Sequence, residues 1–209
     1  MNENNTKKKF FVELIKPSHY DDDGYVIQWW KSFIPSNSLA CIYGLTHDAA
    51  ERSTLGNDVE FVINSYDELN SVIPVANIIS RFKKNGGHGV VFFVGVQTNQ
   101  FPRTIDIARQ FRNENIQVAI GGFHASGCIA MLPELQDELK EAMEMGITLF
   151  AGEAEEGRLA KVFNDAYHKN MKPLYNFLGD LPGLEGQPTP IMPENVAERY
   201  VTRIGVFDA

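Results

Sequence analysis

The segment from Gly89 to Val96 is an almost uninterrupted run of apolar residues, G-V-V-F-F-V-G-V. Such a run predicts a central parallel strand, because a strand covered by helices on both faces has no solvent-facing side. Strand-like and helix-like segments alternate around it, which is the sequence form of βαβ units. The chain is therefore predicted to be an α/β protein, flavodoxin-like or Rossmann-like, with a doubly wound five-stranded parallel sheet of order 2-1-3-4-5.

The predicted elements divide the chain into three parts. Residues 1–37 form an N-terminal extension, with a short strand over 10–16 and an aromatic helix over 25–33 that carries Tyr25, Trp29, Trp30 and Phe33 at helical spacing. Residues 38–170 form the main domain, and residues 171–209 form a Pro-rich linker or arm that returns to strand character over 203–208. The five expected strands span 39–45, 59–64, 89–96, 117–120 and 147–150. The expected helices span 47–55, 73–84, 103–113 and 129–145, with a last one beginning near Glu155.

Composition narrows the function classes. A net charge of −8 over 209 residues argues against nucleic-acid binding, which needs clustered Lys and Arg. No apolar run reaches the roughly 18–20 residues of a membrane span, and the polar start is unlike a secretory signal, so a cytoplasmic location is expected. Cys41 and Cys128 lie far apart and form neither a disulfide framework nor a metal cluster; each is expected to be a small buried residue.

The loops that follow the predicted strands hold the candidate site, because open parallel sheets bind ligands beyond the carboxyl ends of their strands. These loops are rich in glycine, amide and hydroxyl groups but poor in paired catalytic groups, which favours binding over catalysis. No catalytic or metal-binding residue is assigned. The candidate cofactor-binding residues are Leu45, Thr46, Val96, Gln97, Thr98, Gln100, Gly121, Gly122, Phe123, His124, Gly152, Glu153 and Glu155.

The Gly121-Gly122 pair follows a β-branched strand and precedes His124. Glycine lets a backbone approach a large ligand closely, although the same pair also suits a tight strand-to-helix turn that binds nothing. His124 could be a ligand, a hydrogen-bond donor or a helix cap. Glu153 and Glu155 could hold a ligand hydroxyl or cap the next helix.

Three common cofactor sites of this architecture fit the loops poorly. The predicted third strand ends in Val96-Gln97-Thr98, where a phospho-acceptor receiver would need an aspartate. Thr46 followed by His47 makes a poor flavin phosphate loop, and no G-x-G-x-x-G stands in the first turn for a dinucleotide.

Six segments, each weak alone, are specific as a set: I-K-P-S-H-Y-D-D-D-G-Y from Ile15, I-P-S-N-S-L-A from Ile34, V-G-V-Q-T-N-Q-F-P-R from Val94, I-G-G-F-H-A-S-G from Ile120, F-A-G-E-A-E-E-G from Phe150 and P-L-Y-N from Pro173. Together they resemble the cobalamin (B12)-binding domain that precedes the catalytic barrel in B12-dependent radical S-adenosylmethionine proteins. The resemblance covers most of the chain.

The resemblance implies a role for several loops. In such domains the corrin ring lies over the strand carboxyl ends and the nucleotide tail enters a slot. Gln97 and Thr98 would line that slot, Gly121 and Gly122 would admit the tail, and residues 152–155 would close its far side. Cobalamin is then the expected cofactor, while a four-iron cluster and S-adenosylmethionine would belong only to a C-terminal barrel, present in cis or in trans.

The chain departs from the family in two places. The D-x-H-x-x-G motif that supplies a cobalt-binding histidine is absent, since His47 has Leu45 two positions before it and Ala50 three after it. His47 therefore stays only as an unorthodox ligand. The cysteine-rich loop expected after Phe207 is also absent, so the chain is expected to be an N-terminal half that does not cleave S-adenosylmethionine alone.

The leading hypothesis is thus a cobalamin-binding domain whose partners are cobalamin and a radical barrel, with no nucleic acid and no membrane. Whether the chain belongs to an enzyme stays open. Two alternatives remain: a cofactor-free interaction module that docks a partner through Trp29 and Trp30, and a flavin-binding electron carrier.

Overall fold

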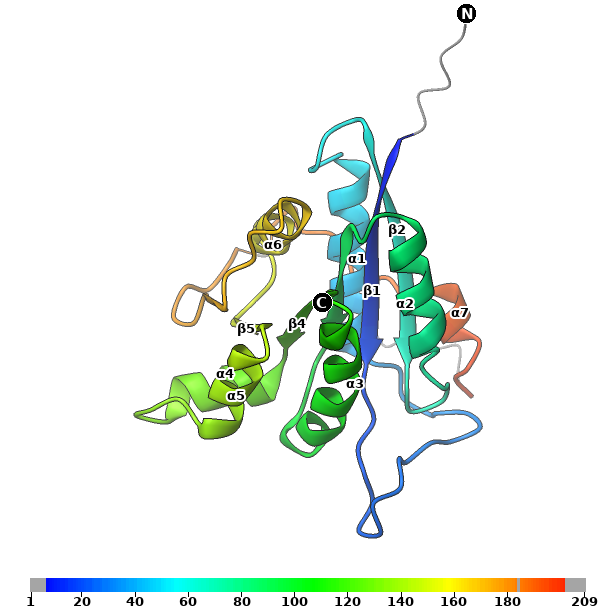
Figure 1. The fold of residues 1–209 in the computed structure, drawn as a ribbon, viewed down its shortest axis with the longest axis vertical. Helices are drawn as coiled ribbons and strands as arrows, with labels where there is room; N and C mark the ends of the chain where they lie inside the picture. Colours follow the sequence, from blue (N-terminus) through cyan, green and yellow to red (C-terminus); the bar gives the residue numbers. More distant parts are fainter. Residues whose placement is uncertain (1–6, 184, 202–209) are drawn as a thin grey trace, which may run out of the picture.

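A computed structural model describes residues 7–183 and 185–201. Its centre is a six-stranded, entirely parallel sheet of order β2-β1-β3-β4-β5-β6, with helices on both faces (Figure 1). The strands are β1 (Lys8–Lys16), β2 (Val59–Asp67), β3 (Gly89–Phe93), β4 (Gln117–Gly121), β5 (Ile147–Ala151) and β6 (Leu174–Asn176). The helices are α1 (Asn37–Glu51), α2 (Val75–Lys84), the 3₁₀ turn η1 (Thr98–Gln100), α3 (Phe101–Asn113), α4 (Phe123–Met131), α5 (Asp137–Glu144), α6 (Arg158–Tyr167) and α7 (Glu194–Ala197). The class is α/β with a Rossmann-like parallel sheet, as predicted.

The predicted first strand, 39–45, is wrong, because these residues lie inside helix α1. Ser36 caps that helix: its side chain accepts a hydrogen bond from the backbone N–H of Leu39 at 3.3 Å. The Ser36-Asn37-Ser38 cluster therefore starts a helix rather than ending one. The actual first strand, β1, comes from the predicted N-terminal extension and pairs with both β2 and β3. Strand β1 replaces the predicted first strand, and β6 from the predicted arm adds a sixth, so the strand count and order differ from the prediction of five strands in the order 2-1-3-4-5.

Three predicted helices also differ. The helix expected over 47–55 is the C-terminal part of α1, which ends at Glu51. The segment 25–33 is an irregular loop, not an aromatic helix. The expected helix over 129–145 is split into α4 and α5, and the break contains Pro133, which cannot supply a helical N–H. Gly122 lets the first of these helices begin directly after β4.

The two faces of the sheet bury separate cores. Phe10, Val12 and Leu14 of β1 face one core, which the helices α1 and α6 cover. Phe11 and Ile15 face the other core, which α2, α3 and α5 cover. Each fully buried side chain of this size contributes roughly 1.5–3 kcal/mol, so β1 alone contributes to both cores.

A charged side chain is buried in strand β1. The Glu13 carboxylate on β1 is fully buried, and the Arg81 guanidinium on α2 donates to both of its oxygens at 2.8 and 2.9 Å. Burial raises the pKa of Glu13, and Arg81 opposes that rise. The ion pair thus locks α2 onto β1, since a lone buried carboxylate would be costly.

After β6 the chain crosses the α1 face of the sheet and reaches β2 at the far edge, as the orange segment leading to α7 shows (Figure 1). The N–H of Ile191 donates to the carbonyl of Ala40 at 3.1 Å. Gly44 permits this close approach, because a Cβ there would lie 2.6 Å from the carbonyl oxygen of Thr189. The Tyr200 hydroxyl donates to Asp67 at the end of β2. The expected strand over 203–208 lies outside the described residues.

Candidate functional site

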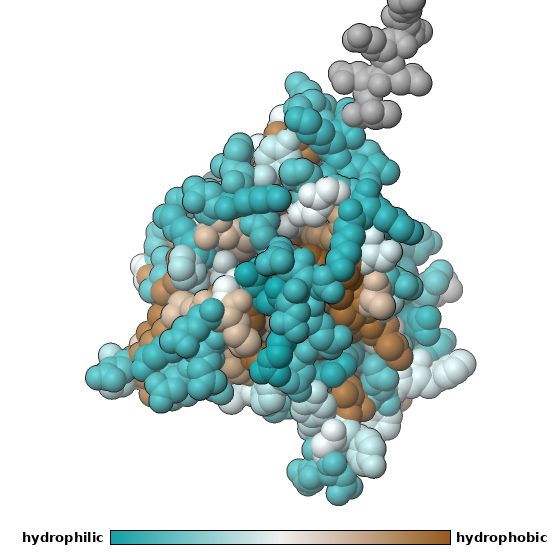
Figure 2. Space-filling view, viewed as in Figure 1, coloured by the Kyte–Doolittle hydropathy of each residue, from teal (hydrophilic) through white to brown (hydrophobic). Residues whose placement is uncertain are grey.

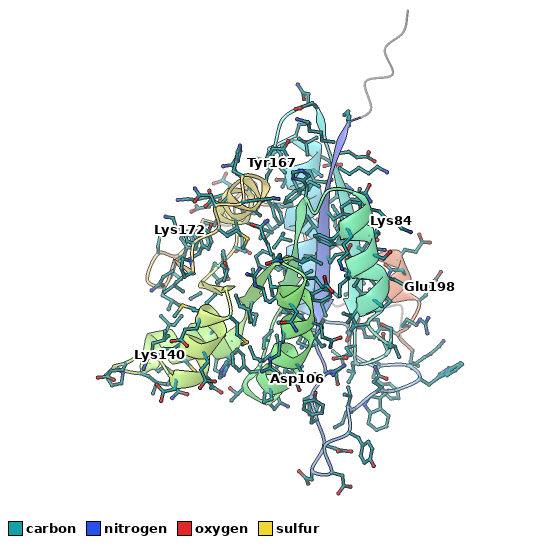
Figure 3. All side chains as sticks on the ribbon, in the orientation of Figure 1. Lys84, Asp106, Lys140, Tyr167, Lys172 and Glu198 are labelled. Carbon is teal, nitrogen blue, oxygen red and sulfur yellow. The ribbon has the colours of Figure 1, made fainter. Side chains whose placement is uncertain are left out.

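The carboxyl ends of β3, β4 and β5 border a cleft of about 280 Å³. This is the lower edge in Figures 1 and 3, where Asp106 and Lys140 lie, while Tyr167 and Lys84 mark the upper, amino edge (Figure 3). The first turns of α1 form one wall, and the loop after β5 forms another. The lining residues are Asn37, Ser38, Cys41, Ile42, Phe92, Phe93, Val94, Gly95, Gly121, Gly122, Phe150, Gly152, Glu153, Ala154, Glu155 and Leu159.

Five of the predicted site residues line this cleft: Gly121, Gly122, Gly152, Glu153 and Glu155. They come from the ends of β4 and β5, which pair directly in the sheet. The prediction that these two loops meet at one edge is therefore confirmed.

The remaining predicted residues do not line it. Leu45 and Thr46 lie in the third turn of α1, where the buried Thr46 hydroxyl donates to the Ile42 carbonyl at 2.6 Å. Their predicted place after a strand is wrong, because the strand itself is a helix. The others, which lie in the β3–α3 loop and at the start of α4, are Val96, Gln97, Thr98, Gln100, Phe123 and His124.

The amides expected to bind ligand instead hold the β3–α3 turn. The Gln100 side-chain oxygen accepts from the Gln97 N–H at 3.0 Å and from the Lys16 ammonium at 2.8 Å. Burial lowers the pKa of Lys16, and nearby Asp67 opposes that shift. The Gln100 side chain thus accepts hydrogen bonds from a half-buried cation and from a backbone N–H of the turn.

His124 is also used internally. Its Nδ1 lies 3.3 Å from the Thr98 hydroxyl, its Nε2 lies 3.1 Å from Glu138 of α5, and its ring centre is 4.3 Å from that of Phe101. The ring is almost fully buried, and burial lowers its pKa while Glu138 raises it. Among the roles considered, the structure favours a hydrogen-bonded core histidine that ties α4 to its neighbours.

The glycines of the cleft differ in what they require. Gly122 has φ +136°, and a Cβ there would lie 2.2 Å from the backbone nitrogen of Val96. The turn itself therefore requires glycine at position 122. Gly121 has no such conformation, and its added Cβ would meet only Phe150, at 3.6 Å. A side chain at position 121 would therefore narrow the cleft without straining the backbone.

Glu155 supplies the unusual polar group of the cleft. Its Oε2 is buried, and no hydrogen-bond partner for this oxygen exists in the described part of the chain. Leaving such an acceptor unpaired costs roughly 1–3 kcal/mol, so a donor from a ligand would relieve a real penalty. The thiol of Cys41 faces the same region: burial, Glu155 and Glu153 together raise its pKa.

The α1 wall was missed by sequence reasoning. Asn37, Ser38, Cys41 and Ile42 all belong to the helix that was predicted to be a loop and a strand. The signal was present, because a serine directly before an apolar periodic run is a helix N-cap. With that interpretation, I-P-S-N-S-L-A becomes the start of a helix at the carboxyl edge of the sheet.

His47 lies on α1 but outside the cleft lining, and its ring is 3.5 Å from the carboxylate of Glu51. Within residues 7–183 and 185–201, no group of three or more His, Cys, Asp or Glu side chains is placed to hold a metal ion. The cleft is lined by backbone, amide, hydroxyl, thiol and carboxylate groups together with apolar side chains.

No protein family matches the chain, and neither the curated proteins nor the solved structures contain a significant match. The helices of the described residues were also searched for a stretch both long and apolar enough to cross a bilayer, and none qualifies.

Proposed function

We propose that this chain binds cobalamin and holds its nucleotide tail in the carboxyl-edge cleft. The observation that carries the proposal is the buried, unpaired Oε2 of Glu155 in the wall of that cleft. The residue motifs of the sequence supply the choice of cobalamin, because they resemble the B12-binding domain of radical S-adenosylmethionine proteins.

The size and donor set of the cleft fit the tail rather than the whole cofactor. Ligand pockets usually span about 300–1,000 Å³, and this cleft, at about 280 Å³, suits a heteroaromatic base with its ribose. Glu155 would accept a hydrogen bond from a tail hydroxyl, and Ser38 and Asn37 would offer donors from α1. The corrin would remain outside, over the strand ends.

Bound cobalamin supplies methyl transfer or an electron or radical partner to a catalytic domain. This chain would bind and orient it, and the radical chemistry would belong to a barrel in cis or in trans. His47 lies outside the lining of the cleft, which supports binding without a protein histidine ligand.

The direct test is retention of hydroxocobalamin after desalting, measured by its visible absorbance. Wild type should retain the cofactor, and Glu155→Gln and Gly121→Val should each weaken retention at least tenfold. Glu156→Gln is the matched control, since this neighbouring carboxylate lies outside the cleft lining and bonds the Gly183 N–H instead. Absence of corrin absorbance in the wild type would overturn the proposal, and retention of flavin mononucleotide instead would favour a flavin electron carrier.

The two cysteines provide a second readout of where the ligand lies. Both are half-buried, but Cys41 lines the cleft and Cys128 does not. Hydroxocobalamin should slow alkylation of Cys41 and leave Cys128 unchanged, as measured by mass spectrometry. Equal protection of both thiols, or of neither, would contradict binding in this cleft.

A further inference from the structure

The loop between β1 and α1 exposes an unusual group of large apolar side chains. We define the aromatic loop as residues 25–34 together with Val72, which directly follows Ser71, whose carbonyl accepts a hydrogen bond from the Gln28 side chain at 3.3 Å. Its exposed members, with the exposed fraction of each, are Trp30 (90 %), Ile34 (82 %), Val72 (76 %), Tyr25 (72 %), Phe33 (72 %) and Trp29 (62 %). Single exposed apolar residues are ordinary, but so many large ones on one short loop are typical of an interaction site.

The backbone of the aromatic loop is held firmly although its side chains face outward. The N–H of Trp29 donates to the Leu69 carbonyl at 2.7 Å, and the Gln28 side chain donates to the Glu68 carbonyl at 3.1 Å. Ser32 exchanges two backbone hydrogen bonds with the arm, from its N–H to Arg199 and from Val201 to its carbonyl. Little conformational entropy would thus be lost when a partner covers these aromatic rings.

Opposite charges flank the aromatic rings on the same segment. The turn that precedes them carries Asp21, Asp22 and Asp23, and forms the hydrophilic tip at the bottom of Figure 2. Asp21 is used locally, because it accepts the N–H groups of Asp23 and Tyr25. Lys31, directly after the tryptophans, is exposed, and no ion pair involving it is found within the described ranges.

We propose that the aromatic loop is the contact surface for a second copy of this chain, arranged about a two-fold axis. In such an interface each patch meets its own copy, so Lys31 of one protomer faces Asp22 and Asp23 of the other in both directions. The apolar rings then form the centre and the charges form the rim.

The exposed area is of the size that this arrangement needs. Each aromatic side chain can bury about 150–250 Å², and four in the aromatic loop are exposed by 62–90 %, in addition to Ile34 and Val72. Several hundred Å² of apolar surface results, which approaches the roughly 800 Å² that each partner contributes to a standard interface. The acidic tip and the net charge of −8 disfavour an anionic membrane as the occupant.

Sedimentation velocity of the full chain over a range of concentrations tests the proposal. Wild type should dimerise, and Trp30→Ala should weaken dimerisation at least tenfold, as truncation of a central aromatic anchor does. Met131→Ala removes an equally exposed apolar side chain on α4 and should leave the dimer unchanged. Because Trp30 is almost fully exposed, circular dichroism should show unchanged folding of the variant.

Charge reversal tests the two-fold pairing itself. Lys31→Glu should weaken the dimer, and Lys31→Glu combined with Asp22→Lys should restore it, because the paired charges are exchanged. A wild type that is monomeric at every concentration, a dimer insensitive to Trp30→Ala, or a Lys31→Glu loss that the second substitution does not rescue would each overturn the proposal. So would binding of the monomer to phosphatidylcholine vesicles through Trp30. None of these outcomes depends on cobalamin.

Discussion

The two edges of the sheet each carry a hollow, and the larger one is the poorer candidate site. At the carboxyl edge the cleft measures about 280 Å³, whereas a hollow at the amino edge measures about 550 Å³. The amino-edge hollow contains Arg112, whose Nε donates to the Met145 carbonyl at 3.0 Å and whose Nη1 donates to the Ile116 carbonyl at 2.8 Å. The smaller cleft contains the unpaired Glu155 oxygen. Unmet hydrogen bonding, rather than volume, distinguishes them.

Helix direction reinforces this difference. Helices α3 and α5 end at the amino edge, where their last carbonyls carry partial negative charge, and Arg112 bonds the carbonyls just beyond both helices. Helix α1 begins at the cleft, and the amide of Asn37 and the hydroxyl of Ser38 in its first turn belong to the lining. The amino edge is thus internally satisfied, while the carboxyl edge keeps both donors and an acceptor available.

The largest expected effect comes from replacing the sterically required glycine at each edge of the sheet. Gly122→Ala should cost about 3–5 kcal/mol of unfolding free energy, since both backbone overlap and positive φ oppose it. Gly89→Ala at the amino edge should cost as much, because its Cβ would lie 2.1 Å from the Phe11 carbonyl oxygen. Gly121→Ala should cost under about 1 kcal/mol. Urea unfolding measures all three, and a tolerated Gly122→Ala would refute the steric argument.

The next test removes the charged group of each edge in turn, Arg112 at the amino edge and Glu155 at the carboxyl edge. Arg112→Met should cost about 2–4 kcal/mol in urea unfolding, because two carbonyls lose a charged donor, while any cofactor retention stays intact in the folded variant. Glu155→Gln should change stability by less than about 0.5 kcal/mol. A Glu155→Gln variant as unstable as Arg112→Met would show that Glu155 is structural and would remove the contrast between the edges.

A smaller effect concerns pH and the carboxyl edge. Burial lowers the pKa of His124 from 6.5, so the folded state favours the neutral ring and the unfolded state takes up the proton first. This contribution to stability is complete above pH 6.5 and is lost as pH falls through the lowered pKa. Thermal unfolding of His124→Gln should therefore lose less stability on acidification than wild type. Identical acid dependence of the variant and the wild type would contradict this assignment.

The smallest expected effect is electrostatic. Glu155 raises the pKa of Cys41, so Glu155→Gln should lower that pKa, increase the thiolate fraction and speed alkylation by a factor of a few. The pKa of Cys128 is raised by burial and by Glu138, not by Glu155, which makes its alkylation rate the internal reference. An unchanged alkylation rate of Cys41 would mean that the charge of Glu155 does not influence the pKa of the Cys41 thiol.

The local sequence pattern was sufficient to predict the elements in the middle of the sheet, but it was not sufficient to predict the first ones. The apolar runs of β3 and β5 and the periodicity of α2 and α3 are strong signals, and the elements lie where they were predicted to within a few residues. The segment 39–45 is equally apolar, and a short apolar run suits a strand or a buried helix alike. The contact of Gly44 with the distant Thr189 carbonyl explains its glycine, and no local pattern contains that contact.

The site was predictable only where its residues are neighbours through the sheet. The glycines and glutamates after β4 and β5 follow from topology, because adjacent parallel strands end together. The unpaired state of Glu155 depends on how α1 packs over these ends, and the internal use of His124 depends on Glu138 of another helix. Such pairings arise from tertiary packing and are not encoded in residue spacing.

The chain after β6 has a mechanical consequence. This segment leaves the edge strand β6, passes over α1 and is hydrogen-bonded to the opposite edge strand, β2, through Tyr200 and Asp67. The polypeptide therefore links the two edges of the sheet. Force applied at its far end would load the Tyr200–Asp67 fastening and the short α7 before any strand pairing is sheared. Amide hydrogen exchange at β2 should therefore become faster when Tyr200→Phe removes this hydrogen bond. Under force, the contact between Tyr200 and Asp67 should open first, while the strands of the sheet stay paired.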